Sequence, residues 1–329
     1  MYHKATTLTE FIINEERKLE DTTGTFTLLL TTLENAIKVI ASHIKKTGLV
    51  DIIGSAGSMN SYGEEVQRLD EFSNRLLIDT LLESGLVYAI GSEELEEPIF
   101  ADNMRGDYVV FFDPLDGSGN ISTNVSMGSI FSIYKAPPPA VRVKDVHRQK
   151  EILKKGKEQV AAGYALYGSS VMFVYSAGSS VNGFTLDPSI GSFLLSHPNM
   201  AIPEEGKIYS INEGMSEGLD SGHKNYLKEV KKEDYKLRYI ACMVADVHRT
   251  LISGGIFIYP ANKKDKNGKL RLMFEVNPMS YLVEQAGGKA VGKNGKSPLS
   301  FLPEKVSERF PVALGSIKEV EKYMSFFKK

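Results

Sequence analysis

The chain has 329 residues, more than one hydrophobic core usually covers, so we expect two domains or one large layered domain. A formal net charge of −2 excludes a globally basic nucleic-acid-binding surface, and a single cysteine, Cys242, excludes both an internal disulfide framework and a cysteine-rich zinc site. The start of the sequence lacks a secretory signal, and no apolar run reaches the length of a membrane span, which together indicate a cytoplasmic protein.

Three helices are predicted in the N-terminal part. The first begins near Leu8 with Thr7 or Thr9 as its cap, the second runs from about 26 to about 46, and the third from about 63 to 85. Asp70 lies on the apolar face of the third helix. An acid on such a face is costly unless it is paired or binds something.

Strands follow. Short apolar runs near 87–92, 108–112 and 129–136 precede a polar connector that extends to about 157, and 159–188 contains three strands separated by glycines. The pattern changes around 196–202, after which strands and helices alternate. We therefore expect two domains, 1–196 and 197–329.

Two aspartates end the run in "YVVFFDPLDGSGN", residues 108–120. Pro114 is expected to stop this strand, so that Asp113, Asp116 and the Leu115 carbonyl converge on one point. Hard oxygen ligands of this kind favour Mg²⁺ or Mn²⁺. The turn at 117–120 presents backbone N–H groups suited to a phosphate oxygen. The alternative is a structural Asx turn, which a lone motif of this kind would favour.

Two further stretches carry acids at similar places. Glu93 and Glu94 directly follow an apolar run, and Glu275 is expected inside the apolar strand "MFEV", before Asn277 as an N-cap and Pro278 as the first helical residue. Glu275 could equally lie on an exposed sheet face. With Asp70, four stretches supply acids that could meet at one cation site.

The segments "FDPLDGSGN", "SEE", "QVAAGYALYGSS", "MVADVHRT", "GGIFIYPANKK" and "EVNPM…EQAGG" occur in order along the chain. With them, the sequence resembles class I fructose-1,6-bisphosphatase over nearly its whole length, within the lithium-sensitive, Mg²⁺-dependent sugar phosphatase superfamily. The resemblance implies an α/β fold, a five-layer α-β-α-β-α sandwich of two mixed-sheet domains. It also implies an N-terminal regulatory (AMP-type) domain carrying the metal-binding strand ends, and a C-terminal sugar-bisphosphate-binding domain.

The resemblance also implies roles for individual residues. Glu94, helped by Asp70, would take a proton from the attacking water, and Glu93 would serve both catalysis and metal binding. Two or more Mg²⁺ ions per subunit, with Mn²⁺ possible, would be held by Glu93, Asp113, the Leu115 carbonyl, Asp116, Glu275 and Glu64 on a closing loop. Substrate phosphates and sugar would contact Asp116, Gly117, Ser118, Gly119, Asn212, Arg238, Tyr239, Tyr259 and Lys269.

The implied reaction is hydrolysis of the C1 phosphate of D-fructose 1,6-bisphosphate in gluconeogenesis, by a homo-oligomer, typically a tetramer, in which Arg238 reaches a neighbouring subunit's site. Sedoheptulose-1,7-bisphosphatase or inositol-phosphate phosphatase activity, or a non-catalytic sugar-phosphate sensor, remain alternatives. Met215 replaces a tyrosine that is frequent in the family. Asp107 and Lys135 replace basic residues of the AMP site in animal enzymes, so we expect weak or absent AMP inhibition.

Overall fold

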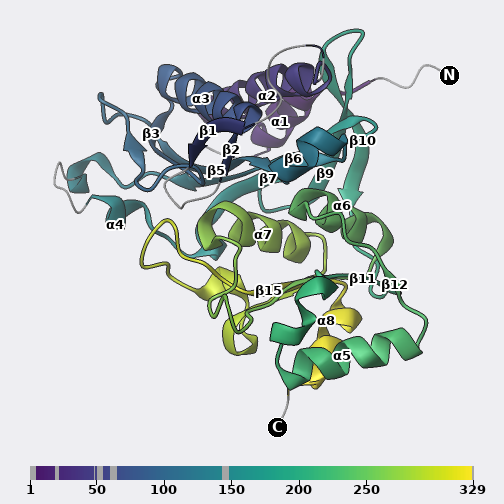
Figure 1. The fold of residues 1–329 in the computed structure, drawn as a ribbon. Helices are drawn as coiled ribbons and strands as arrows, with labels where there is room; N and C mark the ends of the chain where they lie inside the picture. The colour runs from purple at the N-terminus through teal and green to yellow at the C-terminus, as the bar shows by residue number, and fades with distance from the viewer. Residues whose placement is uncertain are drawn as a thin grey trace.

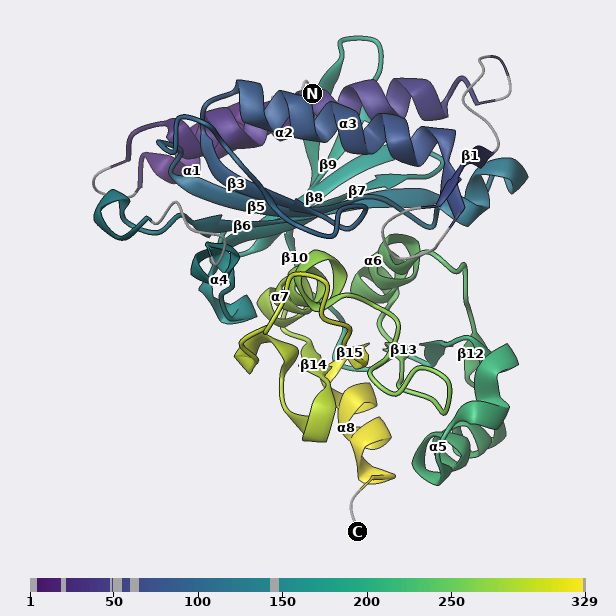
Figure 2. The ribbon, with the colours of Figure 1, turned by 60° about the vertical axis from the view of Figure 1, so that its left-hand side comes forward.

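The structure, a computed structural model, describes residues 5–18, 22–47, 49, 55–59, 65–142 and 148–327. These residues form five layers in the order α-β-α-β-α, which confirms the fold implied by the resemblance (Figures 1 and 2). Two mixed sheets have helices on both of their faces, and they share the helices that lie between them. No helix in the described part of the chain has both the length and the apolar character needed to cross a bilayer.

The outer helical layer covers one face of the large sheet. It consists of α1 (Leu8–Glu16), α2 (Thr25–Ile44) and α3 (Arg68–Glu83). Thr7 caps α1 in a capping box with Glu10, which confirms one of the two predicted caps. The predicted start of the third helix near 63 is wrong. A short strand, β2 (Glu65–Gln67), precedes α3 and pairs with β1 (Ser55–Met59), and the apolar spacing that continues into β2 hid this boundary.

The large sheet has the strand order β10-β9-β8-β7-β6-β5-β3-β4. Its strands are β3 (Val87–Ser92), β4 (Ile99–Phe100), β5 (Tyr108–Asp116), β6 (Met127–Lys135), β7 (Gln159–Tyr167), β8 (Val171–Ser176), β9 (Val181–Asp187) and β10 (Ser192–Met200). β3 and β5 are parallel neighbours, with Ser92 opposite Phe112. Glu93, the first residue after β3, therefore lies beside β5 close to Asp113, and its N–H donates to the Phe112 carbonyl at 3.0 Å.

The prediction that Pro114 ends its strand is wrong, because β5 continues to Asp116. The pairing of β5 with β6 shifts register between Asp113 and Asp116. At such an irregularity the ladder does not need the N–H that proline lacks. The Pro114 carbonyl accepts a hydrogen bond from the Ser129 hydroxyl at 2.7 Å, which anchors the bend.

Helices α6 (Met243–Ser253) and α7 (Asn277–Gln285) lie between the two sheets (Figure 2). The small sheet has the order β12-β11-β13-β15-β14, formed by β11 (Ile208–Ser210), β12 (Lys236–Leu237), β13 (Ile256–Tyr259), β14 (Lys289–Val291) and β15 (Val312–Gly315). Helices α5 (Ser221–Lys232) and α8 (Ile317–Ser325) cover its far face, and the short α4 (Gln149–Ile152) lies beside the large sheet. Apolar residues of both sheets pack around α6 and α7 in one core.

The sequence prediction for the segment around Glu275 is corrected. Glu275 is not in a strand: Leu272–Val276 form one turn of π-helix that runs into α7, so Asn277 is a helical residue and not an N-cap. A short, mostly apolar run that is buried on all sides has no periodicity that would distinguish a strand from a helix. Gly287 follows the last residues of α7 with φ +85°, which is typical of a C′ glycine. Arg238 and Tyr239 follow β12 and lie in a loop.

Candidate active site

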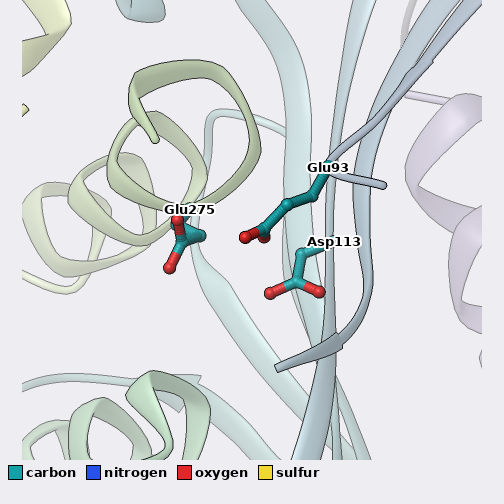
Figure 3. A group of neighbouring side chains, drawn as sticks. All are labelled: Glu93, Asp113 and Glu275. Carbon is teal, nitrogen blue, oxygen red and sulfur yellow. The ribbon is translucent and has the colours of Figure 1, made fainter. Parts of the chain in front are cut away.

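Three carboxylates from different parts of the chain meet at the edge where β3 and β5 end. Glu93, Asp113 and Glu275 each direct an oxygen into one space, and these three oxygens lie within 4.8 Å of one another (Figure 3). Glu93 and Asp113 come from the parallel strand ends, and Glu275 comes from the π-helical turn on the opposite side. The structure brings these three of the predicted acids together, and their role as metal ligands stays a prediction. A set of three hard oxygen donors suits a divalent cation.

Two members of this cluster are almost completely buried. Asp113 and Glu275 are each 5% exposed. Burial, followed by the nearby charge of Glu93, raises the pKa of both carboxyl groups well above the usual range. Negative charges held this close in a site of low polarity repel one another, and a cation would remove that cost.

Arg271 supplies one positive charge beside the cluster. Its guanidinium donates to the Glu93 carboxylate, and its backbone N–H donates to Glu275 Oε2 at 2.6 Å. The arginine is 3% exposed, and its charge lowers the pKa of Glu275, opposing the effect of burial. Arg271 therefore compensates part of the negative charge of the three carboxylates.

Asp116 is oriented differently from Asp113. Its Oδ2 accepts hydrogen bonds from the Val244 N–H at 2.6 Å and from the Cys242 thiol at 3.1 Å, both at the start of α6. The group of three carboxylates does not include it. Burial raises the pKa of Asp116, and these hydrogen bonds oppose the rise. Burial and the neighbouring Asp116 raise the pKa of the Cys242 thiol, which stays protonated and able to donate.

The turn after Asp116 opens a short 3₁₀-helix, Ser118–Thr123. Gly117 has φ +77°, and a Cβ at this position would lie 2.7 Å from the Cys242 Cβ. Only glycine allows both this backbone conformation and the close approach of α6. The first N–H groups of a helix have no partner within it, so those of Ser118 and Gly119 suit an anion, whereas the Asn120 N–H donates to the Gly117 carbonyl at 2.8 Å. We call residues 117–120 the phosphate loop.

A single cleft of about 350 Å³ contains most of the predicted site. Its walls include the carboxylate cluster, Glu94, the Leu115 segment and the phosphate loop. From the side of the small sheet, it is lined by Asn212, Tyr239, Tyr259 and Lys269. Burial raises the pKa of Tyr239 to about 12 and also raises that of Tyr259, so both phenols remain protonated hydrogen-bond donors.

Glu94 is held by a short chain of hydrogen bonds. Its N–H donates to the Ser92 hydroxyl at 3.3 Å, and that hydroxyl donates to the Asn74 side chain on α3 at 2.6 Å. Two predicted residues do not line the cleft, and a third is not among the described residues. Asp70 is buried in the first turn of α3 and does not line the cleft, Arg238 is exposed, and Glu64 lies outside the described residues.

Comparison with known proteins identifies the family. Residues 6–198 match the family described as Fructose-1-6-bisphosphatase, N-terminal domain, and residues 202–328 match Fructose-1-6-bisphosphatase, C-terminal domain. The chain belongs to the fructose-1,6-bisphosphatase family. It is 50% identical over 329 residues to "Fructose-1,6-bisphosphatase class 1" of Persephonella marina, with 99% of each chain covered. It is 47% identical to "Fructose-1,6-bisphosphatase, cytosolic" of Arabidopsis thaliana, covering 98% of this chain and 94% of that protein.

Solved structures of the fructose-1,6-bisphosphatase family share the fold. The crystal structure of Leishmania major fructose-1,6-bisphosphatase in holo form superposes with a TM-score of 0.93 at 42% identity, covering 99% of this chain and 100% of that chain. The T-state structure of the same enzyme gives a TM-score of 0.90. The arrangement of layers and strand ends described above is therefore shared with a fructose-1,6-bisphosphatase.

Six residues that line the cleft of this fructose-1,6-bisphosphatase family member were not predicted from its sequence: Ala241, Cys242, Met243, Phe257, Leu270 and Arg271. An arginine four residues before an acid inside an apolar run was the available signal for Arg271, because a buried acid needs a partner. The available signal for Cys242 was its place directly before the first turn of a predicted helix, which is an N-cap position. Nothing in the sequence marks Ala241, whose φ of +61° is unusual for alanine.

Proposed function

We propose that this protein hydrolyses the C1 phosphate of D-fructose 1,6-bisphosphate to give fructose 6-phosphate and phosphate, a reaction of gluconeogenesis. The observation that carries the proposal is the cleft itself, in which three converging carboxylates adjoin a phosphate loop and a second set of polar groups. The 50% identity with a class 1 enzyme of this name along the whole chain supports it further.

The donor set fits divalent metal ions. Glu93, Asp113 and Glu275 would hold two or more Mg²⁺ ions, or Mn²⁺, with Asp116, the Leu115 carbonyl and Glu64 as further ligands. Bound ions would polarise the phosphoryl oxygens, make water more acidic and stabilise the departing sugar oxygen. All the proposed side-chain ligands are carboxylates, which favours these hard ions over zinc.

Glu94 is the proposed general base. Water attacks phosphorus, Glu94 accepts the proton that this water loses, and the bond between phosphorus and the C1 oxygen breaks with its electron pair staying on the sugar. The bond from the Glu94 N–H to Ser92 supports a fixed position for this residue. Asp70 would assist it.

The second set of polar groups in the cleft would hold the 6-phosphate. Asn212, Tyr239, Tyr259 and Lys269 supply hydrogen-bond donors and one positive charge at the far side of the cleft, and Asp116 with residues 117–119 would hold the 1-phosphate. Binding energy from the distant phosphate can then be used at the reacting end.

The assembly and location belong to the same proposal. Arg238 is exposed on this chain, as a residue that reaches a neighbouring subunit's site would be, so we propose a homotetramer. The relatives named cytosolic support a cytoplasmic location. We also propose that the chain divides near residue 197 into a regulatory domain and a sugar-bisphosphate-binding domain.

Phosphate release with Mg²⁺ tests the activity. We expect turnover of fructose 1,6-bisphosphate well above that of sedoheptulose 1,7-bisphosphate and of inositol monophosphate. A preference for either of the other two would reassign the substrate, and binding without release of phosphate would indicate a sensor. Glu94→Gln should lower kcat far more than it raises KM, while the exposed Glu97→Gln on the same loop should match the wild type. Unchanged kcat in Glu94→Gln would remove this residue from the mechanism.

A further inference from the structure

Asp246 takes no part in the proposed chemistry, yet it is completely buried. It lies in the first turn of α6 with 0% exposure. Both of its carboxylate oxygens accept from the Ile240 N–H, at 3.2 and 3.0 Å, and Arg249 Nη2 donates to Oδ1 at 2.7 Å. A buried carboxylate is unfavourable unless it is paired and hydrogen-bonded. Of the two partners of Asp246, Ile240 belongs to a neighbouring loop, and Arg249 also donates a hydrogen bond to that loop.

That loop, residues 238–242, forms part of the cleft wall. Tyr239, Ala241 and Cys242 line the cleft. Arg249 Nη2 also donates to the Arg238 carbonyl at 3.0 Å, so the same guanidinium holds the start of the loop and the carboxylate of Asp246. Ala241 has φ +61°, a backbone conformation that an alanine keeps only when its surroundings impose it.

The Ile240 peptide is held from both sides. Its N–H donates to Asp246, and its carbonyl accepts from Asn120 Nδ2 at 3.2 Å. Asn120 belongs to the phosphate loop and donates at the same time to the Ser126 carbonyl at 3.2 Å. One peptide therefore connects the loop beside the carboxylate cluster to the loop that carries Tyr239.

We propose that Asp246, with Arg249 as its charge partner, is a positioning residue that fixes the separation of the two phosphate-binding halves of the cleft. In this role it determines the preference for a sugar carrying two phosphates over the same sugar carrying one. The inference rests on the proposed function. It concerns the 238–242 loop, whose last residue, Cys242, donates to the proposed metal ligand Asp116 at 3.1 Å, so the Mg²⁺ dependence is measured as well.

The test compares fructose 1,6-bisphosphate with fructose 1-phosphate, which lacks only the distant phosphate. Asp246→Asn keeps the size of the side chain but removes the charge-assisted bond, which is worth about a tenfold change in an equilibrium constant. We expect kcat/KM for the bisphosphate to fall about tenfold, mainly because KM rises. The value of kcat/KM for fructose 1-phosphate should change less than about twofold. The Mg²⁺ concentration that gives half of the full activity should also change less than about twofold. Asp220→Asn, which alters a carboxylate bonded to a backbone N–H on the distant α5, is the matched control and should leave all values unchanged.

Equal changes for both substrates, or no change for either, would overturn the inference while leaving the proposed function intact. Absence of phosphate release by the wild type would instead refute the proposed function. If Asp246→Asn does not fold, Arg249→Lys decides the question. It keeps the positive charge but lacks the branched guanidinium that reaches both the Asp246 carboxylate and the Arg238 carbonyl, so it must show the same selective loss for the bisphosphate. A folded Arg249→Lys with wild-type KM for the bisphosphate would overturn the inference.

Discussion

Replacing Asp113 with asparagine should make the protein more stable when metal is absent. The change removes one negative charge from the cluster and leaves the shape of the side chain almost unchanged. Asparagine also retains the Oδ1 that accepts the Leu115 N–H at 3.0 Å. The main consequence is therefore electrostatic.

The size of the effect follows from the geometry. The oxygens of Asp113, Glu93 and Glu275 lie within 4.8 Å of one another. Two unit charges at about that distance repel by roughly 3 kcal/mol at an effective dielectric constant of about 20. The charge of Arg271 offsets part of this repulsion, so we expect the free energy of unfolding of the metal-free protein to rise by about 2 kcal/mol. The melting temperature should then rise by about 3 °C.

Thermal unfolding in EDTA and in saturating Mg²⁺ measures both halves of this prediction. Metal at about 100 times its dissociation constant adds about 2.7 kcal/mol to the free energy of unfolding of the wild type. Asp113→Asn should gain much less. The difference in melting temperature between the two proteins should therefore shrink or reverse in Mg²⁺. Glu97→Gln, which removes an exposed charge, should follow the wild type in both buffers. A variant that melts at or below the wild type in EDTA would refute the reasoning, because the three acids would then not be repelling one another.

Three other predictions follow from particular residues. Ala241→Gly should raise the free energy of unfolding by up to about 1 kcal/mol, because glycine adopts φ +61° without strain. The melting temperature should rise with it, and a lower melting temperature would contradict this. Burial lowers the pKa of His248, whose Nδ1 pairs with the Tyr164 hydroxyl, to about 4. With an unfolded pKa near 6.5, the neutral imidazole stabilises the fold fully above that pH, and about 2 kcal/mol is lost by pH 5. His248→Gln should therefore lose less stability than the wild type between pH 7 and pH 5 in urea titrations, and equal losses would show that His248 is not responsible. Finally, Asp107 places a carboxylate where the AMP site of animal enzymes has a basic residue, and a carboxylate repels a phosphate, so activity should persist in millimolar AMP; inhibition at micromolar AMP would disprove this.

Much of the site could be predicted because strand ends are visible in the sequence. Apolar runs that stop at Glu93 and at Asp113 correctly indicated acids at one sheet edge, and the spacing of leucines and isoleucines correctly indicated α1 and α2. These signals are local, and both depend on a change from apolar to polar residues within a few positions.

Other features depend on contacts between distant segments. The π-helical turn that carries Glu275 and the hydrogen bonds that turn Asp116 toward α6 arise from packing against elements far away in sequence. The burial of Arg271 beside Glu93 is of the same kind, because a sequence pattern does not show which charges become enclosed. The continuation of β5 past Pro114 depended on a register shift opposite β6, which propensity does not reveal.

The most direct test of the metal site is an anomalous difference map from crystals soaked in Mn²⁺. We predict strong manganese peaks in contact with the carboxylate oxygens of Glu93, Asp113 and Glu275, in the cleft beside the phosphate loop. Manganese bound only at surface carboxylates, with no peak between these three side chains, would contradict the proposed metal-dependent hydrolysis.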